Sequence, residues 1–244
     1  PVRRHGLEGE LLMTDTLFTM PVRREGLKPL IYAAGLLPAA VYVYLGIADR
    51  LGADPVRALE HALGLWSLRF LVIGLAITPL RRLGGPNLVI YRRAIGLLAF
   101  FYALMHLGVY ITLDRGLDWQ AIAADILRRP YITIGMISFA LLVPLAITSN
   151  NSMMRRLGGP AWRRLHKLTY PAAIAAALHF VLVVKSWPPE PLVYAALIGA
   201  LLLIRAIDVQ RLGGQIVRAC RFSHVSGHTS MMSGVPSTST MTDS

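Results

Sequence analysis

The sequence is poor in charged residues and in cysteine. Charged residues make up 16% of its 244 residues and hydrophobic ones 55%, whereas a soluble domain carries about 25% charged residues. The single cysteine, Cys220, excludes an internal disulfide and any iron–sulfur cluster held by the cysteines of one chain. The sequence also lacks the alternating short strands of a membrane β-barrel. Helices therefore remain as the elements that must bury this apolar composition.

Long apolar runs are what the sequence has in abundance. A helix that crosses a bilayer needs roughly 20 mostly apolar residues, and proline or glycine inside such a run is tolerated in membranes. The pattern predicts an all-α polytopic membrane protein, a bundle of six transmembrane helices. The predicted spans are 29–48, 62–80, 94–113, 131–148, 168–186 and 191–207.

The net charge of +12 reports the orientation of these helices. If the N-terminus is cytoplasmic, eighteen of the Lys and Arg residues fall on the cytoplasmic side and six on the outer side. This asymmetry follows the positive-inside rule and predicts that both termini lie in the cytoplasm of a bacterial inner-membrane protein. The basic residues are then expected to contact anionic membrane lipid, and no nucleic acid partner is expected.

Three segments are expected along the chain. Residues 29–210 form the transmembrane domain. Residues 1–28 are a polar N-terminal extension that is expected to be poorly ordered and lacks the apolar core of a cleavable signal peptide. Residues 211–244 form a polar tail, rich in Ser and Thr, that is predicted to be disordered.

A short basic motif recurs in the cytoplasmic segments. Arg-Arg-Leu-Gly-Gly-Pro occupies 81–86 and 155–160, and Arg-Leu-Gly-Gly returns at 211–214. Arginine suits the negative end of a helix dipole, and Gly-Gly-Pro ends a helix. The copies are interpreted either as helix stops with topogenic charge or as a cationic rim that holds an anionic cofactor or a partner.

Two histidines stand inside predicted spans, where ionisable residues are costly and mark functional sites. His106 lies 13 residues after Arg93, and His179 lies 13 residues after His166. Both spans run outward, so both imidazoles are expected at one depth, about 20 Å from the cytoplasmic end of the span. Paired histidines on different helices are what a bis-imidazole haem requires. The alternative is two histidines that bond only to backbone or water.

Arg69 and His166 are further candidates with open roles. Arg69 lies near the expected depth of the histidine pair, where it could pair with a haem carboxylate or face a polar crevice. His166 lacks a histidine opposite it, because Arg93 occupies the matching position of the third span. It could complete a site with another helix, flank a flavin, or lie at the membrane interface.

A set of short motifs occurs in a fixed order, with histidine spacings of 60 and 13 residues. The motifs lie at 51–56 with His61, 77–80, 104–107, 129–131, 156–158, 162–166 with Tyr170, His179, and 189–194. In this order they resemble the MsrQ (formerly YedZ) family, the haem-binding membrane subunits of periplasmic methionine sulfoxide reductase systems, within the ferric-reductase-like transmembrane group. The resemblance covers about 29–210.

The resemblance implies cofactors and partners. It implies haem b and a bound flavin mononucleotide (FMN), with electrons from quinol or a cytoplasmic flavin reductase. The implied acceptor is a periplasmic molybdenum-containing methionine sulfoxide reductase that repairs oxidised proteins. His106, His166 and His179 match the haem-associated histidines of the family, with His166 a possible iron ligand. Arg92 and Arg93 match its cytoplasmic basic pair, a candidate flavin-phosphate site.

Three functions remain open at this point. The favoured one is an electron-transfer subunit without a substrate-reducing site of its own, because about 37 residues follow the sixth run, too few for a flavin and nucleotide domain. The second is a transmembrane ferric reductase core that works with a partner dehydrogenase. The third is a transporter or scaffold without haem.

Overall fold

The structure is a computed structural model that describes residues 27–184 and 189–207. Within these ranges every regular element is a helix. The chain divides into two units, Pro1–Ile198 and Gly199–Ser244. Of the second unit only residues 199–207 are described, and they are helical. The candidate site lies in the first unit.

Six helical segments are long and apolar enough to cross a membrane, which confirms the predicted fold class. The third consists of a 3₁₀ turn, α4 and a π-helical turn, and the fifth of α8, a 3₁₀ turn and α9. The segments are α2 (Leu27–Ile47), α3 (Pro55–Arg82), η1 (Val89–Tyr91) with α4 (Arg92–Val109) and η2 (Tyr110–Asp114), α6 (Pro130–Ile147), α8 (Gly159–Leu165) with η3 (His166–Leu168) and α9 (Thr169–Val183), and Pro189–Ile207.

Two short helices connect these spans. At the end of the bundle that the charge asymmetry predicts to face outward, called the outer end below, α5 (Trp119–Arg128) joins η2 to α6 and begins at Asp118, whose carboxylate accepts from the Gln120 and Ala121 N–H groups. At the opposite end, called the cytoplasmic end, α7 (Asn151–Leu157) joins α6 to α8 and is capped by the Asn150 side chain. Side chains of this kind satisfy the first N–H groups of a helix, which explains where both connectors begin.

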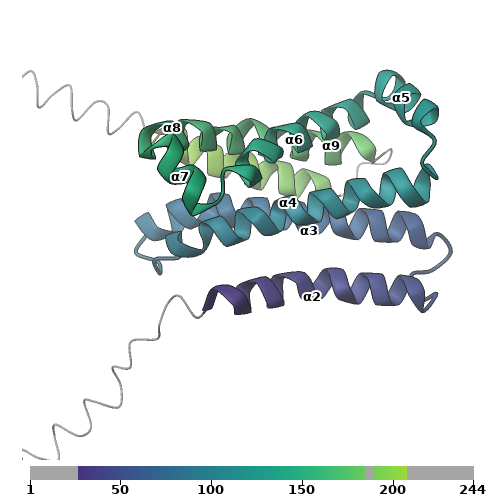
Figure 1. Ribbon diagram of the computed structural model, residues 1–244, viewed down its shortest axis with the longest axis horizontal. Coiled ribbons are helices and arrows are strands. Elements are labelled where there is room, and N and C mark those ends of the chain that lie inside the picture. The colour runs from purple at the N-terminus through teal and green to yellow at the C-terminus, as the bar shows by residue number, and fades with distance from the viewer. Residues whose placement is uncertain (1–26, 185–188, 208–244) are drawn as a thin grey trace, which may run out of the picture. The chain divides into compact units, whose positions relative to one another are not determined.

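The spans pack as two close pairs, α3 with α4 and α6 with α9 (Figure 1). Small residues lie at the contacts: Ala99 on α4 and Ala172 on α9 are fully buried. In membranes, small residues let helix backbones approach closely and so replace the hydrophobic drive that helices have in water. This close packing brings side chains of the α3–α4 pair near side chains of the α6–α9 pair.

A tyrosine joins α2 to the first pair. Tyr102 on α4 is 0% exposed, and its hydroxyl donates to the Gly35 carbonyl at 2.7 Å and accepts from the Ala39 N–H at 2.9 Å. In a regular helix the Ala39 N–H would bond that same carbonyl. The hydroxyl therefore bridges two backbone groups of one turn of α2, next to Pro38, where the missing N–H of proline weakens the hydrogen bonding of the helix itself.

The two described copies of the Arg-Arg-Leu-Gly-Gly-Pro motif contain helix ends, as the helix-stop interpretation predicts. The first glycine of each copy has a positive φ, +86° at Gly84 and +73° at Gly158, a conformation that favours glycine. The second copy differs from the prediction because its arginines belong to α7, and Gly158 joins α7 directly to α8. The third copy lies outside the described residues.

The predicted terminal segments are almost wholly outside the described residues. Only positions 27 and 28 of the predicted N-terminal extension are described, as the first residues of α2. The fifth span also begins earlier than predicted, at Gly159 instead of residue 168, because α8 and η3 continue into α9.

Candidate functional site

His106 is held by the backbone of the neighbouring helix. Its Nδ1 lies 2.9 Å from the Glu60 carbonyl oxygen on α3. The ring also lies against Gly64, where an added Cβ would stand 3.1 Å from Nδ1. Gly64 is four residues after Glu60, so its own N–H bonds to the same carbonyl in the α-helix. The absence of a side chain at Gly64 lets the imidazole reach a carbonyl that is already part of the helix.

His179 is held in the same way by the second pair. Its Nδ1 lies 2.7 Å from the Tyr131 carbonyl oxygen on α6. An added Cβ at Gly135 would stand 2.8 Å from Nδ1. Here too the glycine follows the carbonyl residue by four positions, which gives both histidines the same support.

These hydrogen bonds decide which ring nitrogen of each histidine is available to bind a metal. A carbonyl oxygen only accepts, so Nδ1 carries the hydrogen in both neutral rings and Nε2 keeps its lone pair. An imidazole that donates Nδ1–H to a carbonyl is the usual arrangement of a metal-binding histidine. The rings of His106 and His179 have centroids 6.2 Å apart and planes at 76°.

The pair fits the axial positions of one haem iron. Imidazole nitrogens bind first-row metals at about 2.0 Å, and a ring centre lies roughly 1.2 Å behind its nitrogen. Two imidazoles on opposite sides of one metal therefore have centroids about 6.4 Å apart, close to the 6.2 Å observed. Within the described residues no group of three or more His, Cys, Asp or Glu could hold a bare metal ion. A haem brings four nitrogens and requires two from the protein.

A cavity of about 560 Å³ contains both histidines, within the roughly 300–1,000 Å³ of cofactor pockets. Its deep end is apolar and includes Leu71, Phe139 and Leu142. Its outer end is charged. The charged lining residues are Arg57, Glu60, Asp114, Arg115 and Arg129. A cavity with an apolar interior and one charged mouth suits a planar apolar ring with acidic groups on one edge.

The two helix pairs repeat one pattern around the cavity. Serine hydroxyls three residues after each glycine also bond across the pair: Ser67 Oγ donates to the Ala99 carbonyl at 2.8 Å, and Ser138 Oγ to the Ala172 carbonyl at 2.9 Å. Each of these alanines precedes its histidine by seven residues. The matched sets are Glu60, Gly64, Ser67, Ala99 and His106 in the first pair, and Tyr131, Gly135, Ser138, Ala172 and His179 in the second.

The repeat extends to the cytoplasmic ends of both pairs. Each copy of Arg-Arg-Leu-Gly-Gly-Pro lies between the first and second helix of its pair. The sequence Leu-Ala-Ile-Thr also occurs twice, at 75–78 and 145–148. The two halves therefore present equivalent histidines to one shared cavity.

The structure places Arg69 outside this lining. Its Nε donates to the Tyr194 hydroxyl at 3.0 Å, and its guanidinium lies 4.9 Å from the centre of the Trp66 ring. These contacts join α3 to the helix that begins at Pro189.

His166 lies at the cytoplasmic end of the fifth span, apart from the histidine pair. Its ring stacks on Trp162 at 3.9 Å, and its Nε2 is 3.4 Å from the Thr148 hydroxyl. The 3₁₀ turn η3 begins at His166 and separates it from the regular helix α9 that carries His179.

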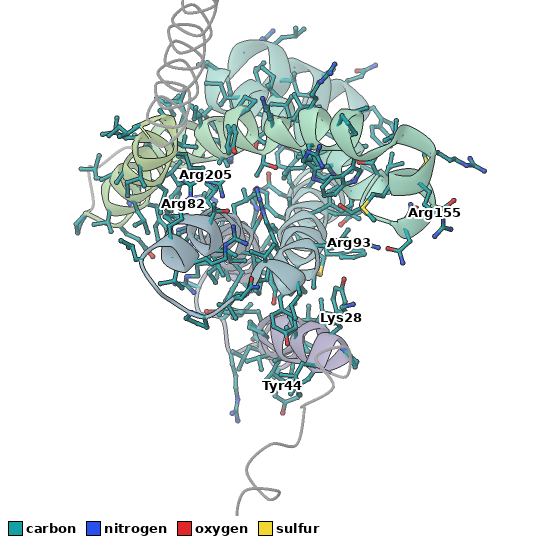
Figure 2. All side chains as sticks on the ribbon, turned by 90° about the vertical axis from the view of Figure 1, so that its left-hand side faces the viewer. Lys28, Tyr44, Arg82, Arg93, Arg155 and Arg205 are labelled. Carbon is teal, nitrogen blue, oxygen red and sulfur yellow. The ribbon has the colours of Figure 1, made fainter. Side chains whose placement is uncertain are left out.

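Arg92 and Arg93 begin α4 at this same end. Arg93 Nη1 donates to Asn151 Oδ1 at 2.7 Å, and Arg92 is close enough to His166 for an electrostatic interaction. Figure 2 looks onto this end, and the basic side chains that it labels include Lys28 of α2, Arg82 of α3, Arg93 of α4 and Arg155 of α7.

The supports of the histidines could not be recognised as such from the sequence. Ala103 and Ala176, which lie three residues before the histidines in sequence, line the cavity, but the close contacts come from Gly64 and Gly135 on other helices. One signal was available: Gly-x-x-Ser occurs at the same depth in the second and fourth spans.

The fold and the histidine pair define a membrane protein of the ferric-reductase-like class. Residues 62–177 match the family described as "Ferric reductase like transmembrane component". The match includes His106 and both glycines and ends two residues before His179.

Curated relatives narrow the class to one family. The proteins named "Protein-methionine-sulfoxide reductase heme-binding subunit MsrQ" of Brucella ovis, Brucella canis and Brucella suis are each 59% identical to this chain over 176 residues. The aligned part covers 72% of this chain and 80% of each relative. The chain belongs to the MsrQ family and is a multi-pass protein of the bacterial inner membrane.

Proposed function

We propose that the chain holds a b-type haem between His106 and His179 and passes electrons through the membrane to a separate protein on the outer side. The observation that carries this proposal is the matched support of the two imidazoles. Each donates Nδ1–H to a main-chain carbonyl, which leaves Nε2 with its lone pair, and the two rings line one cavity with centroids 6.2 Å apart. The heme-binding description of the MsrQ relatives supports it.

The chain's own residues orient the ligands and exclude water. A bound haem supplies a one-electron couple whose potential depends on its axial ligands, hydrogen bonds and burial. The Glu60 and Tyr131 carbonyls fix the two imidazoles before the cofactor binds, which raises the basicity of Nε2. Leu71, Phe139 and Leu142 give the deep end of the cavity an apolar lining, which disfavours water there.

The proposed acceptor is a periplasmic molybdenum-containing methionine sulfoxide reductase that repairs oxidised proteins. The name of the relatives supports a methionine sulfoxide reductase as the partner. The chain itself would contain no substrate-reducing site. The position of the histidine pair in the outer half of the spans supports delivery of electrons to that side.

The proposed donor is quinol or a flavin reductase in the cytoplasm, with FMN as a second cofactor. Arg92 and Arg93 would bind the FMN phosphate, and His166 with Trp162 would lie beside the flavin or complete a further haem-associated site. The concentration of basic side chains at the cytoplasmic end supports an anionic cofactor or an acidic partner there (Figure 2).

The competing function is a ferric reductase core that works with a partner dehydrogenase. The match to the ferric-reductase-like family supports this alternative. Purified protein supplied with a cytoplasmic flavin reductase would reduce an external ferric chelate under this alternative. Under the proposed function, methionine sulfoxide reduction would instead require the separate periplasmic subunit.

Difference spectra of reduced and oxidised protein test the proposal. The purified protein is expected to show a b-type spectrum that is lost in His106→Ala and in His179→Ala. His61→Ala is the matched control, because His61 lines the same cavity but its ring contacts Phe180; it should retain the spectrum. Protein that stays colourless after expression with ample haem would contradict the proposal, and so would haem that survives both ligand substitutions.

A further inference from the structure

Each half of the repeat places an arginine at the mouth of the cavity. Arg57 lies three residues before Glu60, and Arg129 lies two residues before Tyr131. Glu60 and Tyr131 supply the carbonyls that hold the histidines. Both arginines line the cavity. Arg57 is therefore about one helical turn, and Arg129 about half a turn, outside the carbonyl residue of its own half.

An aspartate orients each of these guanidiniums through Nε. Arg57 Nε is 3.2 Å from Asp54 Oδ2, and Arg129 Nε is 3.1 Å from Asp125 Oδ1. The Arg129 Nη1 also donates to the Tyr131 hydroxyl at 3.2 Å. A guanidinium has five N–H donors. The Nε contact leaves both terminal nitrogens of Arg57, and in Arg129 it leaves Nη2 and the second N–H of Nη1; the terminal nitrogens form the fork that binds a carboxylate in a bidentate manner.

Arg129 remains fully charged at the mouth. Its hydrogen bond with the Tyr131 hydroxyl and the nearby Asp125 carboxylate raise the pKa of Arg129 above its usual value. Its side chain is 46% exposed and that of Arg57 is 81% exposed, so neither guanidinium is enclosed by the fold.

The third arginine of the mouth has a different environment. Arg115 lies between Asp114 and Asp125, with Nε at 3.2 Å and Nη2 at 2.6 Å from them, and its side chain is 25% exposed. Its guanidinium also lies 5.6 Å from the centre of the Tyr110 ring. These contacts enclose Arg115 and join η2 to α5, which makes it a structural residue.

We propose that Arg57 and Arg129, one from each half of the repeat, bind the two carboxylates of the haem at the outer mouth of the cavity. The inference rests on the proposed function, since it requires a haem between His106 and His179. Glu60 also lines the mouth, so acidic groups of a ligand there need cations beside them. The carboxylate edge of the haem then faces the outer side, toward the electron acceptor.

Redox titration of the haem-loaded protein tests the two arginines. A guanidinium that a haem carboxylate holds near the iron favours the reduced, less positive state, whereas a guanidinium that projects freely into water is screened. Arg57→Gln and Arg129→Gln are therefore each expected to lower the midpoint potential. The expected effect of each is an about threefold lower ratio of reduced to oxidised haem at the wild-type midpoint, or roughly 28 mV at 59 mV per tenfold. The double variant should lower this ratio about tenfold, or by roughly 59 mV.

Two controls carry the same substitution outside the cavity lining. Arg128→Gln alters the exposed residue next to Arg129, and Arg69→Gln alters the arginine bound to Tyr194. Both should keep the wild-type potential. A shift in Arg69→Gln with none in the mouth variants would overturn the inference in favour of Arg69.

Esterified haem separates carboxylate binding from a general effect of charge or folding. In protein reconstituted with haem dimethyl ester, the midpoint potential of Arg57→Gln should equal that of the wild type. This comparison remains valid even if Arg129→Gln does not fold. Equal shifts with haem and with the ester would overturn the inference. A wild-type midpoint potential in both mouth variants, with haem retained, would also overturn the inference. That result would leave the proposed function intact. Wild-type protein without haem would overturn both.

Discussion

His106 and His179 are oriented by backbone carbonyls and by glycines of neighbouring helices, and not by functional side chains. A carbonyl inside a helix has two lone pairs, of which the helix uses one. Gly64 and Gly135 open the helix surface so that an imidazole on a neighbouring helix reaches the second lone pair. The site therefore depends on two glycines as much as on the two histidines.

A methyl group at Gly135 should disturb the site directly. In Gly135→Ala the new Cβ would stand 2.8 Å from His179 Nδ1, so the ring must move and lose its bond to the carbonyl. Overpacking of this kind costs about 1–3 kcal/mol, enough to weaken haem binding by roughly tenfold. The haem-to-protein ratio of the purified variant measures the loss.

Gly108→Ala is the matched control for this substitution. It adds the same methyl group to α4, two residues after His106, where nothing lies within 4 Å of the new Cβ. Haem content should equal that of the wild type. An equal loss in both variants would mean that the contact at Gly135 is not the cause.

At the scale of elements, α2 is attached to the rest of the bundle by polar contacts within apolar surroundings. The Tyr102 hydroxyl bonds both the Gly35 carbonyl and the Ala39 N–H of α2. Phe70 and Trp66 surround the tyrosine ring. Lipid offers no water to satisfy these backbone groups, so the hydroxyl is the partner on which this turn of α2 depends.

Tyr102→Phe should destabilise the protein through this turn. Removal of the hydroxyl leaves the Ala39 N–H and the Gly35 carbonyl without their partner, at a cost of about 1–3 kcal/mol. Thermal unfolding in detergent should begin at a lower temperature than in wild type. Tyr44→Phe, at a position 65% exposed on the same helix α2, should leave the transition unchanged. A wild-type transition in Tyr102→Phe would contradict this account of α2.

For the molecule as a whole, the distribution of charge sets the orientation in the membrane. Six spans return the chain to the side on which it began, as the prediction of two termini on one side requires. The basic connections after α3 and in α7 and α8 lie at one end of the spans, and α5 lies at the other end (Figure 1).

Cysteine labelling tests this topology, because Cys220 is the only native thiol. In a Cys220→Ser background, Ala53→Cys should react with a membrane-impermeant maleimide in intact spheroplasts. Asn87→Cys should react only after lysis, because its connection carries the basic residues that stay inside. Both positions are exposed in the structure. The reverse pattern would invert the topology and place the cavity mouth on the cytoplasmic side.

The sequence alone determined the class, the spans and the histidine pair. Apolar runs and the asymmetry of Lys and Arg depend on transfer of side chains into lipid, a property that each segment has locally. The equal depth expected for His106 and His179 agrees with their ring contact, because depth within a straight helix follows from counting residues.

Only the tertiary structure decided what surrounds these histidines. The Glu60 and Tyr131 carbonyls and the two glycines belong to other helices than the histidines they hold. Which helices pair, and how each is rotated about its axis, depends on packing between segments distant in sequence. The same rotation directs Arg69 to Tyr194 and places Arg57 and Arg129 at the cavity. Residue counting along one helix gives depth but not rotation, and for that reason the partners of the site required the packed bundle.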